Sequence, residues 1–167
     1  MGKTPENIRA AFAGESQANR KYLAFAKAAE AEGRRQVAKL FRAAAEAETI
    51  HAMGHLKAMG GIGNTLENLK AAVQGETHEF TSMYPEFIRL AEAEGSTEAL
   101  RMFRWANQVE EVHAGLYEKY RQAVADGRNP PEVKLYVCSV CGNTVEGEPP
   151  ESCPVCNSAK SAFREVD

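Results

Sequence analysis

The first 127 residues repeat apolar side chains at intervals of three and four, which is the pattern of amphipathic helices. Capping residues and glycines divide this part into four helices, which we expect over residues 4–33, 34–60, 64–95 and 96–127. Thr4 is the expected N-cap of the first helix, with Pro5 at its first position. Helices of ~30 residues are ~45 Å long, as helical bundles require. The pattern predicts an all-α four-helix bundle over residues 1–127.

Two of the apolar stripes are interrupted by a glutamate and a histidine three residues apart, Glu48 with His51 and Glu110 with His113. Residues at this spacing project from the same face of a helix, which here is the apolar face. Val37 and Leu40 belong to the stripe of the first pair. Ionisable groups within a core stripe are costly unless they are paired with charge, and a metal cation is the usual partner. The pattern therefore predicts metal ligands.

An internal duplication relates the two halves of the helical part. Residues 4–15 match residues 65–76 at an offset of 61, whereas residues 29–33 match residues 91–95 at an offset of 62. The two Glu-x-x-His pairs are also separated by 62 positions in the sequence. Each half thus encodes a helical hairpin with one single glutamate and one Glu-x-x-His motif, the ligand set of a ferritin-like dinuclear site. The expected ligands of two metal ions are Glu15, Glu48, His51, Glu76, Glu110 and His113.

The change of offset places one inserted residue in the third helix, between Glu76 and Tyr84. An insertion within a helix is commonly absorbed as a π-helical turn, often at a functional site, so we expect one there. The same stretch carries Glu79, a carboxylate that the first half lacks. Four glutamates balance two divalent cations, so the hypothesis is that Glu79 binds mainly when the metals are oxidised.

Tyr22 and Tyr84 occupy equivalent places in the two halves, close to the expected ligands. They are candidates for hydrogen bonding to the ligands or for supplying protons and electrons. Packing in the core is an alternative of comparable weight.

The composition changes after Gly127: residues 128–132 read as a linker and residues 133–167 as a small module of short strands. This module holds all four cysteines as two Cys-x-x-Cys pairs, a strong signal for a tetrahedral four-thiolate site at Cys138, Cys141, Cys153 and Cys156. The spacing leaves zinc and iron open. Gly142 and Asn157 follow the second cysteines, where positive φ would turn backbone amides toward sulfur. So small a module needs its metal to fold.

Several classes of protein are disfavoured by the composition. The formal net charge of −3 and the absence of a basic block argue against nucleic-acid binding. No apolar run approaches the ~20 residues of a membrane helix, and the first residues lack the apolar core of a signal peptide. We therefore expect a cytoplasmic protein without membrane association, in which the cysteines bind metal rather than form disulfides.

With these motifs in place, the chain resembles the rubrerythrins along essentially its whole length. The resemblance rests on residues 14–16 with Tyr22, on both Glu-x-x-His pairs, on residues 75–79 with 83–85, and on the rubredoxin-like cysteines. It implies a non-heme di-iron peroxidase that reduces hydrogen peroxide to water and is usually a homodimer. It also implies a third iron on the four cysteines, fed by an NAD(P)H-dependent reductase or a rubredoxin, and an iron that moves between the positions of His51 and Glu79. The alternatives are a ferroxidase that handles iron and a zinc-ribbon interaction module on a dimetal bundle.

Overall fold

The computed structural model describes residues 2–166, so the first and last residues of the expected domains, 1 and 167, lie outside the described residues. The chain divides into two compact units, one up to Gly63 and one from Asn64 onward. The boundary falls inside the helical part, between the two halves of the duplication. Each unit is described by itself.

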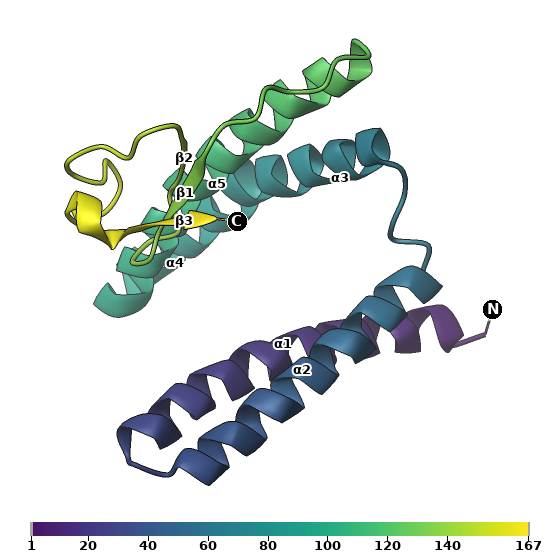
Figure 1. Cartoon of the computed structure of the whole chain (residues 1–167), viewed down its shortest axis with the longest axis vertical. Coiled ribbons are helices and arrows are strands. Elements are labelled where there is room, and N and C mark those ends of the chain that lie inside the picture. Colours follow the sequence, from purple (N-terminus) through teal and green to yellow (C-terminus); the bar gives the residue numbers. More distant parts are fainter. Residues whose placement is uncertain (1, 167) are drawn as a thin grey trace. The chain divides into compact units, whose positions relative to one another are not determined.

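The first unit is a helical hairpin of α1 (Thr4–Ala31) and α2 (Arg35–Ala58), drawn in purple and blue in Figure 1. Gly33 connects the helices with a φ of 75°, a left-handed conformation that glycine adopts without steric cost. The expectation that Thr4 is the N-cap is wrong by one residue. The N-cap is Lys3 and no side chain caps this end. Pro5 still lies in the first turn, where its missing N–H costs no intrahelical hydrogen bond.

Small side chains form the interface between α1 and α2. Ala38, Ala45 and Ala52 recur every seven residues on α2 and are buried, and they face a stripe of α1 that includes Asn19 and Ala26. A seven-residue repeat keeps one narrow seam of each helix toward the other. The expectation that Val37 and Leu40 lie in the core is wrong for this unit, since they are 46% and 66% exposed. Two helices alone bury only their shared seam, and the wider apolar stripe remains outside it.

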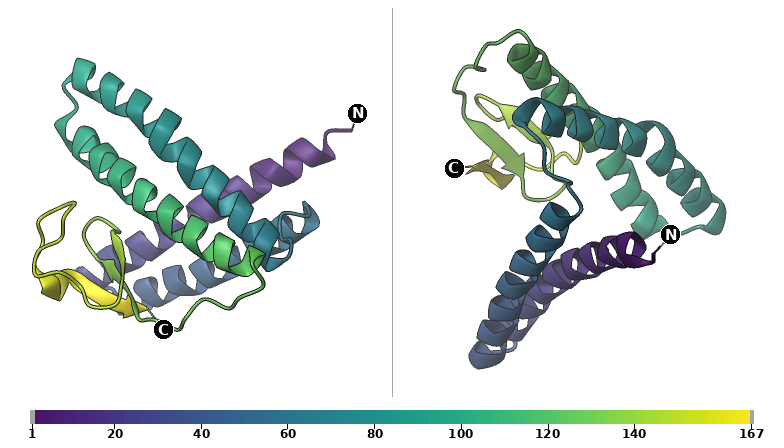
Figure 2. Two further views of the ribbon diagram at one scale, coloured as in Figure 1. Left: turned by 90° about the horizontal axis from the view of Figure 1, so that it is seen from above. Right: turned by 90° about the vertical axis from the view of Figure 1, so that its right-hand side faces the viewer.

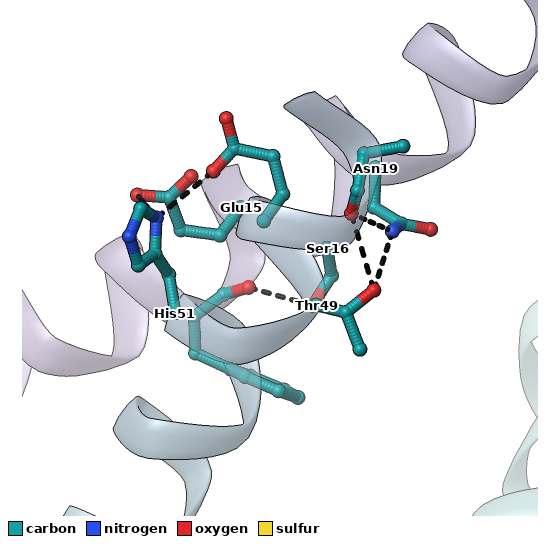
Figure 3. A network of polar contacts seen from close by, with 8 residues as sticks. Glu15, Ser16, Asn19, Thr49 and His51 are labelled. Carbon is teal, nitrogen blue, oxygen red and sulfur yellow. Dashed lines mark hydrogen bonds and ion pairs between the residues drawn. The ribbon is translucent and has the colours of Figure 1, made fainter. Parts of the chain in front are cut away.

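Asn19 is the buried polar residue of this seam. Its Nδ2 donates to the carbonyl oxygen of Ala45 at 2.7 Å and to Oγ1 of Thr49 at 2.8 Å (Figure 3). Thr49 in turn donates to the same carbonyl of Ala45 at 3.1 Å. These bonds fix the register of α1 against α2 one turn away from Glu15 and Glu48.

The second unit begins with a hairpin whose first arm is bent. This arm consists of α3 (Thr65–His78), the π-helical segment η1 (Glu79–Met83) and α4 (Tyr84–Glu94), and the second arm is α5 (Thr97–Ala125). The expected π-helical turn is therefore confirmed, with Glu79 at its start. Asn64 caps α3 through a reciprocal capping box with Glu67. Gly95 closes the arm with a φ of 69°.

A small antiparallel sheet with strand order β2-β1-β3 follows α5 in the same unit. Its elements are β1 (Leu135–Cys138), β2 (Thr144–Glu146), the 3-10 turn η2 (Lys160–Ala162) and β3 (Phe163–Val166). Cys138, Cys153 and Phe163 form its core. The sheet lies against α5 (Figures 1 and 2), where Tyr120 donates to Oε1 of Glu146 at 2.8 Å and Lys119 pairs with the same carboxylate.

The predicted fold class is confirmed: four long helices of a ferritin-like type precede a small module rich in irregular structure. Within the part of the chain that the structure describes, no helix combines the length and the apolar character that crossing a membrane would take.

The Asn19 hydrogen bonds predict a measurable contribution to stability. Replacing Asn19 with Ala should lower the free energy of unfolding by about 1–2 kcal/mol, because one buried and one partly buried hydrogen bond are lost while Thr49 still satisfies the Ala45 carbonyl. Denaturant titration followed by circular dichroism measures this. The matched control is Arg20→Ala on the neighbouring exposed position, expected within about 0.5 kcal/mol of the parent. Equal stability of both variants would contradict the role of Asn19.

Candidate metal centres

The first unit brings together three of the six expected ligands of the dinuclear site. Glu15 projects from α1, and Glu48 and His51 project from successive turns of α2, so that one donor atom of each lies within 4.8 Å of the others. Nδ1 of His51 is 3.1 Å from Oε2 of Glu48 and 4.0 Å from Oε1 of Glu15. Figure 3 shows the Glu15 carboxylate and the His51 ring turned toward each other.

The two carboxylates of this group are close enough to share a hydrogen bond. That bond raises the pKa of Glu15 above its usual range and lowers the pKa of Glu48, which His51 lowers further. Two carboxylates this close ionise together only when positive charge lies nearby. The electrostatics therefore suit a cation between Glu15, Glu48 and His51.

The second unit repeats the arrangement with Glu76 from α3 and Glu110 and His113 from α5. Nδ1 of His113 is 2.7 Å from Oε2 of Glu110. This group is more enclosed than the first, since the side chain of His113 is 26% exposed and that of His51 is 55% exposed. Burial first, and then the charge of Glu110, raise the pKa of Glu76 to about 7.

Glu79 lies beside this second group without joining the three converging donors. Its pKa is raised, first by burial and then by the charge of Glu110, which places its carboxylate within the electrostatic reach of the ligands. The π-helical segment that begins at Glu79 gives the second half a carboxylate next to the site. The binding of Glu79 to the metals mainly in their oxidised state stays a prediction.

Tyr22 and Tyr84 occupy matching aromatic clusters in the two units. Tyr22 packs against Phe25 and Phe41, with ring centroids 6.3 and 6.1 Å away. Tyr84 packs against Phe87 and Phe103, both at 6.2 Å. The pKa of Tyr84 is raised by burial and by the charges of Glu79, Glu110 and Glu76. The structure thus places Tyr84 near the second group of ligands.

Thr144 is a residue beside the ligands that the sequence did not suggest. Its Oγ1 lies 2.9 Å from Nε2 of His113 and donates to the carbonyl oxygen of Gly142 at 3.2 Å. Because the hydroxyl hydrogen is directed to Gly142, the hydroxyl oxygen accepts from Nε2–H of His113. With a cation in place of the 2.7 Å hydrogen bond between Nδ1 and Glu110, this tautomer would make Nδ1 the metal ligand, as hydrogen-bond partners commonly arrange for a metal-binding histidine. No spacing rule links α5 to β2, so only the fold reveals the contact.

The four cysteines form the third group of candidate ligands, with all four Sγ atoms within 4.8 Å of one another. The Cys138 and Cys156 sulfurs are 3.7 Å apart, and those of Cys141 and Cys153 are 3.6 Å apart. A tetrahedral ion with metal–sulfur bonds of 2.3 Å separates its sulfurs by ~3.8 Å. The cysteines are free thiols. Their geometry fits one tetrahedral metal ion.

Backbone conformation supports this four-cysteine cluster as expected from the sequence. Gly142 and Asn157 have φ values of 87° and 60°, and their own amides donate to the carbonyls of Cys138 and Cys153 at 2.9 Å. The next amides along the chain, those of Asn143 and Ser158, donate to the sulfurs of Cys141 and Cys156. Burial opposes ionisation of Cys156, but the hydroxyl and amide of Ser158 outweigh it and lower the pKa of this thiol to about 7. Burial has the opposite net effect on Cys141 and raises the pKa of its thiol. A bound cation would stabilise all four thiolates, the form that binds metal.

Family models match both parts of the chain. The rubrerythrin model matches residues 6–121, and the model of the rubrerythrin rubredoxin-like domain matches residues 136–164. The chain belongs to the rubrerythrin family. Within this family it is similar to nigerythrin of Nitratidesulfovibrio vulgaris, with 39% identity over 98% of this chain and 86% of the relative. It is also 33% identical to rubrerythrin-2 of Clostridium acetobutylicum, over 96% of this chain and 95% of that protein.

Solved structures of nigerythrin support the same assignment. The partially reduced state and the fully reduced, all-ferrous state each align with 99% of this chain and 88% of the other, with 36% identity and a TM-score of 0.59. The rubrerythrin fold therefore accounts for two carboxylate–histidine groups and a four-cysteine group in one chain.

The Thr144 contact predicts a selective loss of metal affinity in this rubrerythrin. Replacing Thr144 with Val removes the acceptor that orients His113, and we expect the affinity for Fe(II) or Co(II) at the helical ligands to fall about tenfold or more. Competition with a chromophoric chelator measures this. Thr144→Ser keeps the hydroxyl and should bind like the parent protein. Unchanged affinity in the Val variant would show that the hydrogen bond has no positioning role.

The raised pKa of Glu76 predicts how the metal-free protein responds to pH. The carboxyl titrates near 4.5 when unfolded and at about 7 when folded, so the folded state holds an extra proton between these values. The preference of the folded state for the protonated carboxyl stabilises the protein at low pH, and this stabilisation is lost as the pH rises from about 4.5 to about 7.

Glu76→Gln should remove that contribution. At pH 8 the metal-free variant should be more stable than the parent, and at pH 4.5 the two should be similar. Chemical denaturation across this pH interval measures the difference, with Glu86→Gln on the exposed surface of α4 as the control. A stability difference that does not change with pH would refute the raised pKa.

Proposed function

We propose that this chain is a non-heme di-iron peroxidase that reduces hydrogen peroxide to water. The observation that carries the proposal is the presence in one chain of two matching ligand groups, each with two carboxylates and one imidazole, and of a four-thiolate group. Carboxylate-rich ligation with one imidazole per metal favours iron or manganese over zinc or copper. The all-ferrous state named for nigerythrin supports iron. Two ferrous ions would supply the two electrons that cleavage of the O–O bond requires.

Two side chains of the protein are proposed to supply the protons of the reaction, which the metals do not provide. Reduction of hydrogen peroxide to two waters takes up two protons along with two electrons. Glu79 and Tyr84 lie on or next to η1, beside the ligands, and both have a raised pKa, so they hold protons at neutral pH more readily than exposed groups. We assign them to proton delivery. Tyr22 takes the equivalent place in the aromatic cluster of the first unit, and we assign it the matching role there.

The four-cysteine group is proposed to return electrons to the di-iron centre one at a time. Within the second unit, β2 of the cysteine-bearing sheet contacts α5 directly, through Thr144 and His113. An iron ion on the four thiolates would thus be separated from the helical ligands by a few residues. The proposed electron donor is an external NAD(P)H-dependent reductase or a rubredoxin. Free thiols that serve as metal ligands suit the reducing cytoplasm, where we place the protein as a homodimer.

An anaerobic single-turnover experiment tests the peroxidase activity. Fully reduced protein, loaded with three irons per chain, should be oxidised rapidly by one equivalent of hydrogen peroxide per helical iron pair, and more slowly by oxygen. Stopped-flow absorbance gives both rates. Faster oxidation by oxygen with iron retained as a mineral would instead indicate a ferroxidase, and failure to bind iron at all would refute both.

The role of the four cysteines gives a separate prediction. Protein with zinc on the four cysteines and iron on the helical ligands should reduce one equivalent of peroxide at the parent rate, because its helical ligands are intact. Steady-state turnover with a reductase should fall by at least tenfold, because Zn²⁺ is not redox-active and cannot transfer electrons to the helical irons. Comparing the two rates in the same preparation measures this. Undiminished steady-state turnover would show that electrons bypass the cysteines.

A further inference from the structure

The cysteine-bearing sheet contacts α5 through the two ends of β2. At one end, Oγ1 of Thr144 accepts from Nε2–H of His113, with 2.9 Å between the two atoms. At the other end, the carboxylate of Glu146 accepts from the hydroxyl of Tyr120 at 2.8 Å and pairs with the ammonium of Lys119. Thr144 and Glu146 are two residues apart on a strand, so both side chains project from the same face. One short strand of the second unit thus holds a metal ligand of its own α5.

The position of Thr144 is set by the loop that surrounds the cysteine sulfurs. Thr144 follows Cys141 by three residues, and its hydroxyl donates to the carbonyl oxygen of Gly142 at 3.2 Å. Asn143 is buried between them, and its amide donates to the sulfur of Cys141. The carbonyl oxygen of Asn143 accepts from the amide of Cys138 at 2.9 Å. The backbone that places the sulfurs therefore also places the Thr144 hydroxyl.

This loop depends on a bound metal to hold its shape. The buried hydrophobic cluster of the sheet consists of Cys138, Cys153 and Phe163, so two of its three members are candidate metal ligands. A module this small buries too little apolar surface to be stable alone, and metal binding supplies the missing free energy of folding. The contact of Thr144 with α5 therefore depends on metal at the cysteines.

Metal at the helical ligands acts on the same contact from the other side. His113 offers Nδ1 to a cation, and the charge of that cation makes the Nε2–H group a stronger donor. A charge-assisted hydrogen bond is stronger than a neutral one, so the bond to Thr144 gains stability. Two metals that strengthen one contact from opposite sides bind cooperatively, and each raises the affinity of the other by the same factor.

We propose that metal on the four cysteines raises the metal affinity of the helical ligands Glu76, Glu110 and His113, with Glu146 as the positioning residue that keeps β2 on α5. Each site should bind metal about tenfold more tightly when the other is filled. The inference rests on the metal ligands of the proposed function and is independent of the reaction with peroxide. The coupling favours helical metal in chains whose four-cysteine site is already filled.

Glu146 suits the positioning role because both of its partners lie on α5. The sheet contains a second carboxylate with the same kinds of partner, Glu165 on β3. Glu165 accepts from Lys134 and from the hydroxyl of Tyr136, both at 3.0 Å, and these two residues lie at the start of the same sheet. The side chain of Glu146 is 20% exposed and that of Glu165 is 43% exposed. Glu146 therefore connects the sheet to the helix, whereas the contacts of Glu165 stay within the sheet.

Cobalt titration of proteins with and without metal on the cysteines tests the coupling. One sample carries one equivalent of Zn²⁺ per chain on the four thiolates. The other carries Cys153→Ser with Cys156→Ser, which removes two thiolates and leaves residues 138–144 unchanged. Competition with a chromophoric chelator gives the Co(II) affinity of the helical ligands, thiolate–cobalt absorption reports any cobalt on cysteine, and circular dichroism compares the helix content. We expect about tenfold weaker binding in the serine variant. Equal affinities would overturn the proposal.

Substitution of Thr144 tests the route of the coupling. In Thr144→Val, zinc-loaded protein and protein with the two serine substitutions should bind Co(II) equally, because the contact between the sites is gone. Thr144→Ser keeps the hydroxyl and should retain the full difference. This double-mutant comparison isolates the pairwise effect from any general effect of zinc on the fold or the charge. A tenfold difference that survives in the Val variant would refute the route through Thr144.

Glu146→Ala tests the positioning role, with Glu165→Ala as the matched control. Both variants keep every metal ligand and Thr144, and both lose a carboxylate that pairs with a lysine and a tyrosine. In zinc-loaded protein, Glu146→Ala should weaken Co(II) binding at the helical ligands by about fivefold, and Glu165→Ala should bind like the parent. Glu146→Gln keeps an acceptor for Tyr120 and should recover part of the loss. Equal binding by the two alanine variants would refute the role of Glu146.

These titrations separate the coupling from the proposed peroxidase activity, because they use neither iron nor peroxide. Coupled Co(II) and Zn²⁺ binding in a protein that does not reduce peroxide would refute the peroxidase and support the coupling. Rapid peroxide reduction by a protein whose two sites bind metal independently would refute the coupling alone.

Discussion

Crowding of like charges is the constraint on which the rest of this structure depends. In each half of the duplication, two helices hold two carboxylates and an imidazole with their donor atoms within 4.8 Å. Such a group is unfavourable without positive charge, as the raised pKa values of Glu15 and Glu76 show. The helices nevertheless keep the groups together, because the spacing of the motifs and the packing of the hairpins fix the backbone. The binding of cations relieves this repulsion.

The two halves have diverged around this shared constraint. One inserted residue converts part of the third helix into a π-helical segment, and Glu79 lies at its start. The second group of ligands is also more enclosed, and the cysteine-bearing sheet of its own unit packs beside it, with Thr144 on His113. The duplication therefore gives both halves the same three ligand residues. The differences between the halves give the second one an additional carboxylate and a neighbouring thiolate cluster.

The apolar positions of α2 differ in how deeply they are buried. Ala38, Ala45 and Ala52 form a seam that one neighbouring helix buries, whereas Leu40 and Ile50 lie outside this seam and are exposed. A hairpin of two helices buries the alanine seam and leaves Leu40 and Ile50 exposed. The amino acids at these positions thus distinguish a narrow seam, which the neighbouring helix buries, from a wider apolar stripe that remains exposed in the first unit.

Local chemistry allowed most of this protein to be predicted from its sequence. Helix periodicity, the Glu-x-x-His and Cys-x-x-Cys spacings and the change of offset in the duplication each act over a few residues, so the helices, the ligand groups and the π-helical turn could be inferred directly. The start of α1 was misplaced by one residue because Thr4 and Pro5 are both acceptable on either side of a helix start.

Only the tertiary structure decided which residues meet across long separations. Thr144 reaches His113 from a strand 31 positions away, a contact that depends on how the sheet packs on α5. The exposure of Val37 and Leu40 likewise depends on how many helices surround α2, which an apolar stripe alone does not specify. Periodicity determines which face of a helix is apolar, but the partner that covers that face is set by packing in three dimensions.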